Sequence, residues 1–185
     1  MKQVYLAACG RSPLSDAGKD INVLDRFRVY FPTKETVTNS TGGPDCGGII
    51  TLSRDFYNAS TFPRQCLRDY QSTRPRLLSH NKLLFARGRK KDGTPIAWVY
   101  IGSANLTEAA WGMQKTLKSG KEGSSLVRNW ECGVVVPVPV ENLKAADVPE
   151  GEIPPMSVFA GTVDVPFVYP GAEYGGREPW IFRSY

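Results

Sequence analysis

Three residues in the middle of the chain carry the side chains that metal-free phosphate chemistry requires. His80 is the only histidine of the 185 residues, Lys82 follows it two positions later, and Asn105 ends the next apolar run. An imidazole that titrates near neutrality can act as a nucleophile or as a general acid and base. Ammonium and amide groups can hold the non-bridging oxygens of a phosphate. A lone histidine is more often structural, so the residue types alone leave both interpretations open.

The sequence around these residues predicts a β-hairpin. Two apolar strands are expected over residues 83–86 and 96–101, and the basic segment between them ends in Asp92-Gly93, a strong turn signal. Side chains alternate along a strand, so His80 and Lys82 are expected on one face. The hairpin would then return Asn105 towards His80. These three side chains are expected to converge at the end of a strand.

A helix is expected to follow the hairpin. Thr107-Glu108-Ala109-Ala110 has the composition of a helix start. A helix N-terminus favours an anion, which adds to the argument for a phosphate pocket. Ser103 and Thr107 are equally well explained as helix-capping residues and as phosphate contacts.

The remainder of the chain predicts an α/β fold, with a mixed sheet flanked by helices in a single domain of residues 1–185. Further helices are expected over residues 3–9, 34–39 (capped by Thr33) and 62–70, and further strands over residues 28–31, 130–140 and 163–168. Trp130, Val134 and Val136 are expected in the core. Residues 115–129 are polar and basic and are expected to form a mobile loop.

Charge favours, without requiring, a nucleic-acid partner. The net charge is +5, and lysine and arginine gather over residues 74–91 and 115–128. A basic surface suits nucleic acid, although two solvated basic loops explain the same composition. The hydrophobic content of 41% and charged content of 22% are ordinary for a globular protein.

The cysteines do not predict a metal site. Cys9, Cys46, Cys66 and Cys132 form no C-x-x-C pair, and a single histidine cannot complete a zinc set with them. Free thiols are expected, with no metal and no cofactor. No stretch approaches the roughly 18 apolar residues of a membrane span, so no membrane partner is expected.

Three motifs together resemble the tyrosyl-DNA phosphodiesterases, a branch of the phospholipase D superfamily. His80-x-Lys82 followed by Gly102-Ser103-Ala104-Asn105-Leu106-Thr107 resembles the second H-x-K…N half-motif of that family. Asn129-Trp130-Glu131-Cys132-Gly133 resembles its Tyr-Glu-Leu-Gly stretch, and Arg177-Glu178-Pro179-Trp180 its C-terminal Arg-Pro-Trp segment. Other phospholipase D relatives carry an aspartate five residues after the lysine. Arg87 occupies that position here, as fits the tyrosyl-DNA branch.

The resemblance implies a phospholipase D-like fold and a role for each matching residue. His80 would be the general acid and base, Lys82 and Asn105 would bind the phosphate, and Glu131 would orient the site through His80. Ser103 and Thr107 would be substrate contacts. Phe182 belongs to an aromatic segment that lines the groove for the peptide side of the substrate.

The resemblance also implies a partner. The family needs two half-motifs and this chain has one histidine, so it is expected to be the C-terminal half of a phosphodiesterase that removes tyrosine or other adducts from DNA 3′ ends through a phospho-histidine intermediate. Its expected partners are adducted DNA, single- or double-stranded, and an N-terminal half carrying the first H-x-K motif. A role in DNA repair implies a nuclear location. Two alternatives stay open: a phospholipase D-type nuclease that completes its site as a homodimer, and a non-catalytic DNA-binding domain.

Overall fold

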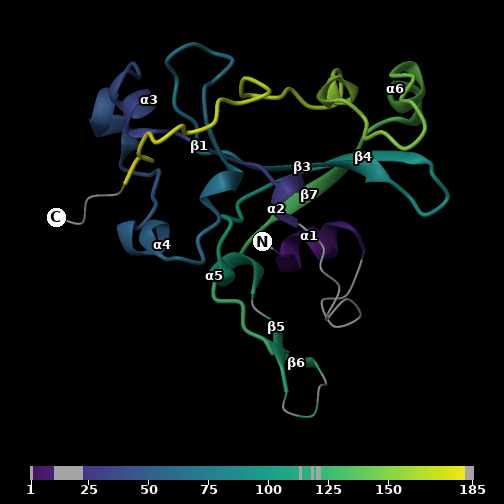
Figure 1. Ribbon diagram of the computed structural model, residues 1–185, viewed down its shortest axis with the longest axis horizontal. Coiled ribbons are helices and arrows are strands. Elements are labelled where there is room, and N and C mark those ends of the chain that lie inside the picture. The colour runs from purple at the N-terminus through teal and green to yellow at the C-terminus, as the bar shows by residue number, and fades with distance from the viewer. Residues whose placement is uncertain (1, 11–22, 113, 118, 120–121, 182–185) are drawn as a thin grey trace. The chain divides into compact units, whose positions relative to one another are not determined.

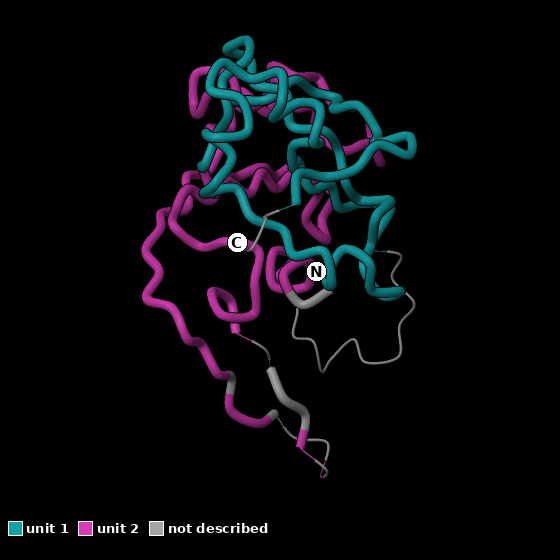
Figure 2. Tube along the Cα trace, turned by 90° about the vertical axis from the view of Figure 1, so that its left-hand side faces the viewer, with its two compact units in different colours: residues 1, 20–80, 165–185 teal, residues 2–19, 81–164 magenta. Residues whose placement is uncertain are grey.

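The computed structural model describes residues 2–10, 23–112, 114–117, 119 and 122–181. Its contacts divide the chain into two compact units (Figure 2). Unit 1 holds residues 1, 20–80 and 165–185, and unit 2 holds residues 2–19 and 81–164. Both units combine short helices with β-strands, so the mixed α/β class is confirmed. The expectation of a single domain stays a prediction.

The main sheet of unit 2 has three antiparallel strands, with β4 in the middle (Figure 1). β3 (Lys82–Arg89) and β4 (Pro95–Gly102) form the predicted hairpin, and β4 also pairs with β7 (Gly133–Pro137). The basic segment expected as a turn is partly strand, because the register continues to Arg89 opposite Pro95. The turn itself is tight. Gly93 has φ of +83°, and the N–H of Lys90 donates to the carbonyl of Thr94 at 2.9 Å.

Short elements accompany this sheet within unit 2. They are α1 (Lys2–Ala8), α5 (Glu108–Trp111), β5 (Gln114–Thr116), β6 (Glu122–Ser125), α6 (Val140–Ala145) and the 3₁₀ helix η3 (Met156–Phe159). The expected helix over residues 3–9 is confirmed as α1. β5 and β6 pair as an antiparallel hairpin (Figure 1), so part of the segment expected to be a mobile loop is regular structure. The core includes Val99, and the ring of Phe85 packs edge-on against buried Phe159, with ring centroids 4.9 Å apart.

Unit 1 is built around two short parallel strands and the segment that closes onto them. β1 (Val29–Phe31) pairs with β2 (Leu67–Asp69), Phe31 lying opposite Asp69. The flanking helices are α2 (Val23–Arg26), α3 (Lys34–Thr38) and α4 (Arg54–Asn58), with 3₁₀ helices η1 (Gly43–Gly47) and η2 (Arg64–Cys66). The strand expected over residues 28–31 is confirmed. Thr33 caps α3 as predicted, since its hydroxyl accepts from the N–H of Thr36 at 3.2 Å.

The segment after residue 164 completes unit 1. The Lys34 N–H donates to Glu178 O at 2.9 Å and the Trp180 N–H to Pro32 O at 3.0 Å. Asp69 lies at the centre of these contacts with its side chain fully buried. Its carboxylate accepts from the Thr33 N–H at 2.9 Å and from Arg177 Nη1 at 3.0 Å.

Three expectations about this framework are wrong. Residues 62–70 were expected to be a helix, but they form η2 followed by β2, because pairing with β1 outweighs the local apolar spacing. Residues 163–168 form no strand and contribute only an isolated bridge between Ser72 and Phe167. Trp130 and Val134 are not core residues, because Trp130 is fully exposed and Val134 is more than half exposed. Val136 is half-buried.

Candidate active site in unit 2

The ends of β3, β4 and β7 meet in register around Lys82. Lys82 is the first residue of β3 and lies opposite Gly102, which in turn lies opposite Gly133. Directly opposite residues share a face of the sheet, so the lysine stands beside two positions that have no side chain. The ring of Tyr100 covers both glycines. A Cβ at Gly133 would lie 2.6 Å from Tyr100 Cζ, and one at Gly102 would lie 2.7 Å from Cys132 O. A side chain at either position would therefore force neighbouring atoms to move.

Glu131 lies two residues before β7 and is held by side chains from two directions. Ser103 Oγ donates to Glu131 Oε2 at 2.6 Å, and Asn129 Nδ2 donates to Glu131 Oε1 at 2.9 Å. Ser103 follows β4 directly, and its backbone N–H donates to Cys132 O at 2.9 Å, which extends the pairing of β4 with β7 by one step. Glu131 is therefore fixed to the end of the sheet.

This arrangement favours the ionised form of Glu131. The hydrogen bond from Ser103, then that from Asn129, lower the pKa of the Glu131 carboxyl below its usual range, and the positive charge of Lys82 lowers it further. The influence of Lys82 places an ammonium and a carboxylate in one electrostatic environment. A phosphate that binds Lys82 would therefore enter a site in which the Glu131 carboxylate is already ionised and ready to accept a hydrogen bond.

Asn105 and Thr107 lead into α5. The Thr107 N–H donates to Asn105 O at 2.7 Å, and the Thr107 hydroxyl accepts from the Ala110 N–H at 3.3 Å. Of the two interpretations of Thr107, the capping role is therefore present in the structure. α5 has only four residues, so any dipole at its N-terminus comes from a single turn. The side chain of Asn105 is exposed at this end of unit 2.

The remaining predicted site residues include His80 and Phe182. His80 is exposed and is the last residue of unit 1, directly before the boundary between the units. Phe182 lies outside the described residues. The structure therefore brings Lys82, Ser103 and Glu131 into one environment within unit 2. The catalytic and binding roles assigned to these three residues, and to His80, Asn105, Thr107 and Phe182, stay predictions.

Asn129 was missed by the sequence interpretation. Residues 128 and 129 are attached to α5, because the N–H groups of Arg128 and Asn129 both donate to Ala109 O, at 2.9 and 3.1 Å. The available signal was spacing. Asn129 precedes Glu131 by two positions, and alternate residues of an extended chain point the same way.

Two arginines of the basic segment next to the motif form hydrogen bonds within the protein. Arg89 donates to Glu152 O at 2.7 Å and to Gly93 O at 2.6 Å, and Arg87 donates to Pro154 O at 2.7 Å. These guanidinium groups anchor the segment 148–154 to β3. Lys90 and Lys91 in the turn are exposed, so their positive charges remain accessible at the surface.

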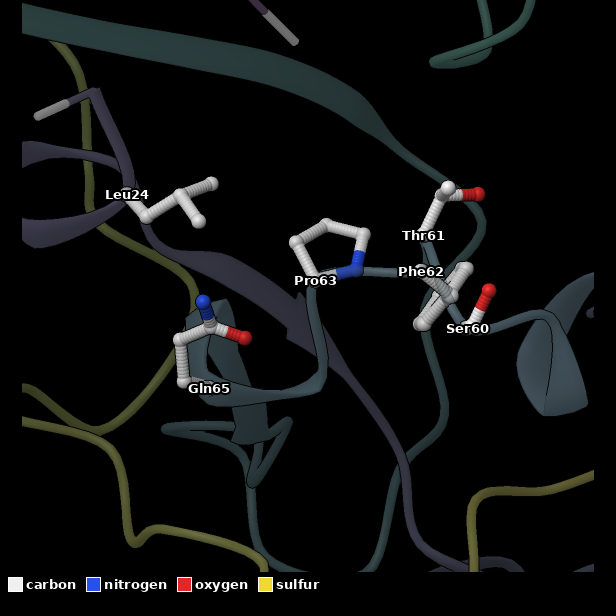
Figure 3. A pocket seen from close by; sticks show the side chains of 6 residues that line it. All are labelled: Leu24, Ser60, Thr61, Phe62, Pro63 and Gln65. Carbon is white, nitrogen blue, oxygen red and sulfur yellow. The ribbon is translucent and has the colours of Figure 1, made fainter. Parts of the chain in front are cut away.

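A hollow in unit 1 is lined by uncharged side chains (Figure 3). It is lined by Leu24, Ser60, Thr61, Phe62, Pro63 and Gln65. Leu24 and Pro63 face each other across it, and none of the lining side chains is ionisable at neutral pH. Such a lining cannot supply general acid and base groups.

The part of the chain that the structure describes contains no group of three His, Cys, Asp or Glu side chains that could hold a metal ion. All four cysteines are free thiols. Across the same described residues, no helix combines the length and the apolar character needed to cross a membrane.

The chain matches a known protein family. The family described as tyrosyl-DNA phosphodiesterase matches residues 7–175. The matched range contains most of both structural units. It includes His80 and the clustered residues Lys82, Ser103, Asn129 and Glu131.

Proposed function

Because the chain belongs to the tyrosyl-DNA phosphodiesterase family, we propose that it supplies one half of an active site that hydrolyses adducts at DNA 3′ ends. The observation that carries the proposal is the cluster at the end of the unit 2 sheet. Lys82 lies opposite Gly102 at the start of the sheet, and its positive charge favours the ionised form of Glu131, whose oxygens accept hydrogen bonds from Ser103 and Asn129. A cation can hold a phosphate, and an oriented carboxylate can position the group that acts as general acid and base.

In this proposal His80 is the general acid and base. It precedes Lys82 by two residues, so an extended backbone presents both side chains on one side at a separation of about 7 Å between their Cα atoms. Glu131 would accept a hydrogen bond from one imidazole nitrogen and leave the other for the leaving oxygen and, later, for water. Lys82 and Asn105 would hold the non-bridging oxygens.

The nucleophile would come from a second half-motif. The chain has a single histidine, and a phospho-histidine mechanism needs one imidazole to attack phosphorus and another to donate a proton. The proposed partner is an N-terminal half carrying the first H-x-K motif, and the proposed substrate is DNA with a 3′ tyrosyl or peptide adduct. A phospholipase D-like fold and a nuclear location are parts of the same proposal.

The decisive experiment is cleavage of a 3′-phosphotyrosyl oligonucleotide by this chain mixed with a chain that bears the first half-motif. We expect no turnover by either chain alone and cleavage by the mixture, also in the presence of a chelator. His80→Gln in the mixture should lower turnover by about 10²–10⁴-fold, the usual contribution of general acid–base catalysis. A covalent phospho-histidine adduct should accumulate, because resolution needs water activation more than a phenolate leaving group needs an acid.

Two matched variants test the assignment of Lys82. Lys82→Ala should abolish cleavage, whereas Lys90→Ala in the exposed turn of the hairpin should leave it unchanged.

Normal turnover by the His80→Gln mixture, without adduct, would remove His80 from the mechanism. Turnover by the isolated chain that rises with the square of its concentration would identify a homodimeric nuclease instead. DNA binding that is sensitive to salt, in the absence of any cleavage, would identify a binding domain.

A further inference from the structure

We propose that Ser103 and Asn129 are positioning residues that hold the Glu131 carboxylate in a single orientation. This inference rests on the proposed function, in which Glu131 orients His80. It reassigns Ser103 from a substrate contact to a support of the carboxylate, and it gives a role to Asn129, to which the motif assigned none.

The first observation is that the two carboxylate oxygens have different donors. Oε2 accepts from the Ser103 hydroxyl at 2.6 Å and Oε1 from the Asn129 amide at 2.9 Å. A carboxylate with one donor can rotate about its last side-chain torsion, which is broad. A donor on each oxygen removes that freedom, so the plane of the group is set. Each oxygen keeps a further lone pair for an imidazole N–H.

The second observation concerns the direction of the Ser103 proton. A hydroxyl has one proton and two lone pairs. Ser103 Oγ accepts from the Cys132 N–H at 3.0 Å, and its possible acceptors are Glu131 Oε2 at 2.6 Å and Cys132 O at 3.3 Å. The shorter bond to an ionised oxygen is the stronger one, and the incoming N–H polarises it further. The hydroxyl therefore donates to Glu131.

The third observation is that Ser103 and Asn129, which together form a clamp on the Glu131 carboxylate, are both attached to regular structure. Ser103 directly follows β4, and the backbone of Asn129 donates to Ala109 O in α5 at 3.1 Å. Glu131 lies between these two anchors. The imidazole N–H of His80 would therefore find its hydrogen-bond acceptor in a fixed place, and this hydrogen bond would set the tautomer of the imidazole.

The clamp also determines the protonation state of Glu131. The charged group that acts on Glu131 from another strand is Lys82 at the start of β3, and it favours the carboxylate. Removal of either donor is expected to raise the pKa of Glu131 towards the usual glutamate range. Asp92 is an internal standard. Its pKa is lowered by donors from Thr94 in the hairpin turn, and these are untouched by changes at Ser103 or Asn129.

The test measures the Glu131 titration by carbon NMR of the side-chain carboxyl, assigned with Glu131→Gln, in the full chain. Ser103→Ala should raise the Glu131 pKa, and Ser103→Thr should restore it because the hydroxyl returns. Asn129→Leu, which keeps the size and loses the donor without adding a charge, should raise it as well. The Asp92 titration should not move in any variant. If a variant at Ser103 fails to fold, the Asn129→Leu titration still decides.

The same variants are then assayed in the complemented cleavage reaction. Ser103→Ala and Asn129→Leu should each lower turnover by about tenfold or more, a smaller loss than that of His80→Gln. The acid limb of the pH profile should move to higher pH, with recovery in Ser103→Thr. A Glu131 pKa that is ordinary in the wild type, or unchanged in both variants, would overturn the clamp while leaving the cleavage result intact. A correct titration without any cleavage by the wild-type mixture would instead refute the proposed function.

Discussion

The ion pair at the centre of unit 1 gives the sharpest test of the framework. Asp69 has no exposed side-chain surface and accepts from three groups, one of them the guanidinium of Arg177 at 3.0 Å. Replacing Asp69 by alanine removes the acceptor that joins β2 to the last segment of the chain. The expected result is local opening of that segment.

The size of the effect follows from what each donor loses. The N–H of fully buried Thr33 is left without its acceptor, at a cost of about 1–3 kcal/mol. Arg177 is 33% exposed and recovers part of its hydration, so its loss is discounted to about 1 kcal/mol. Thr36 keeps a hydroxyl contact with Thr33 at 3.1 Å. The total is about 3 kcal/mol, or roughly a hundredfold in the opening equilibrium.

Hydrogen exchange measures this opening directly. The amides of Lys34 and Trp180 are the probes, because their acceptors, Glu178 O and Pro32 O, are not touched by the substitution. Their protection should fall by about a hundredfold in Asp69→Ala. The control is Glu173→Gln, which removes the surface pair of Arg68 with the 77% exposed Glu173 and should change protection by at most about fivefold. Equal losses in the two variants would refute the reasoning.

Two further predictions concern the same framework. Burial, aided by the Asp69 charge, raises the pKa of Tyr174 far above its usual value of about 10, so above that pH the unfolded state loses a proton that the folded state keeps. Stability to urea should therefore fall as pH rises past about 10, and the fall should be shallower in Tyr174→Phe. Gly102→Ala should cost about 1–3 kcal/mol of unfolding free energy, because its Cβ would lie 2.7 Å from Cys132 O. The control Gly88→Ala, in the same sheet with open space at its Cβ, should be nearly neutral in urea unfolding.

The elements that local sequence specifies were predictable. Asp92-Gly93 between two apolar runs specified the hairpin, and Thr33 specified the start of α3. β2 was not predictable, since its residues fit a helical pattern and become a strand only when β1, far earlier in the chain, pairs with them. A proline at position 166 argues against a central strand over residues 163–168, and the structure has only one bridge there.

The candidate site was predictable in its charged members and not in its supports. Lys82 and Glu131 are recognisable by spacing and motif, and the structure places them in one electrostatic environment. The donor role of Asn129 depends on the attachment of its backbone to Ala109, which no local pattern encodes. The exposure of Trp130 was missed for a related reason, because an apolar strand pattern does not reveal which face a sheet covers.

The division of the chain into units has a consequence for synthesis. Every strand of the main sheet of unit 2 has been made once Pro137 is added, whereas unit 1 begins before residue 80 and is closed by residues after 164. Asp69 and Arg177 are 108 positions apart. At a translation rate of about 5–20 residues per second, the carboxylate waits roughly 5–20 s for its partner. Of the two units, unit 1 is thus the one completed later during synthesis, and it stays longer within reach of chaperones and proteases.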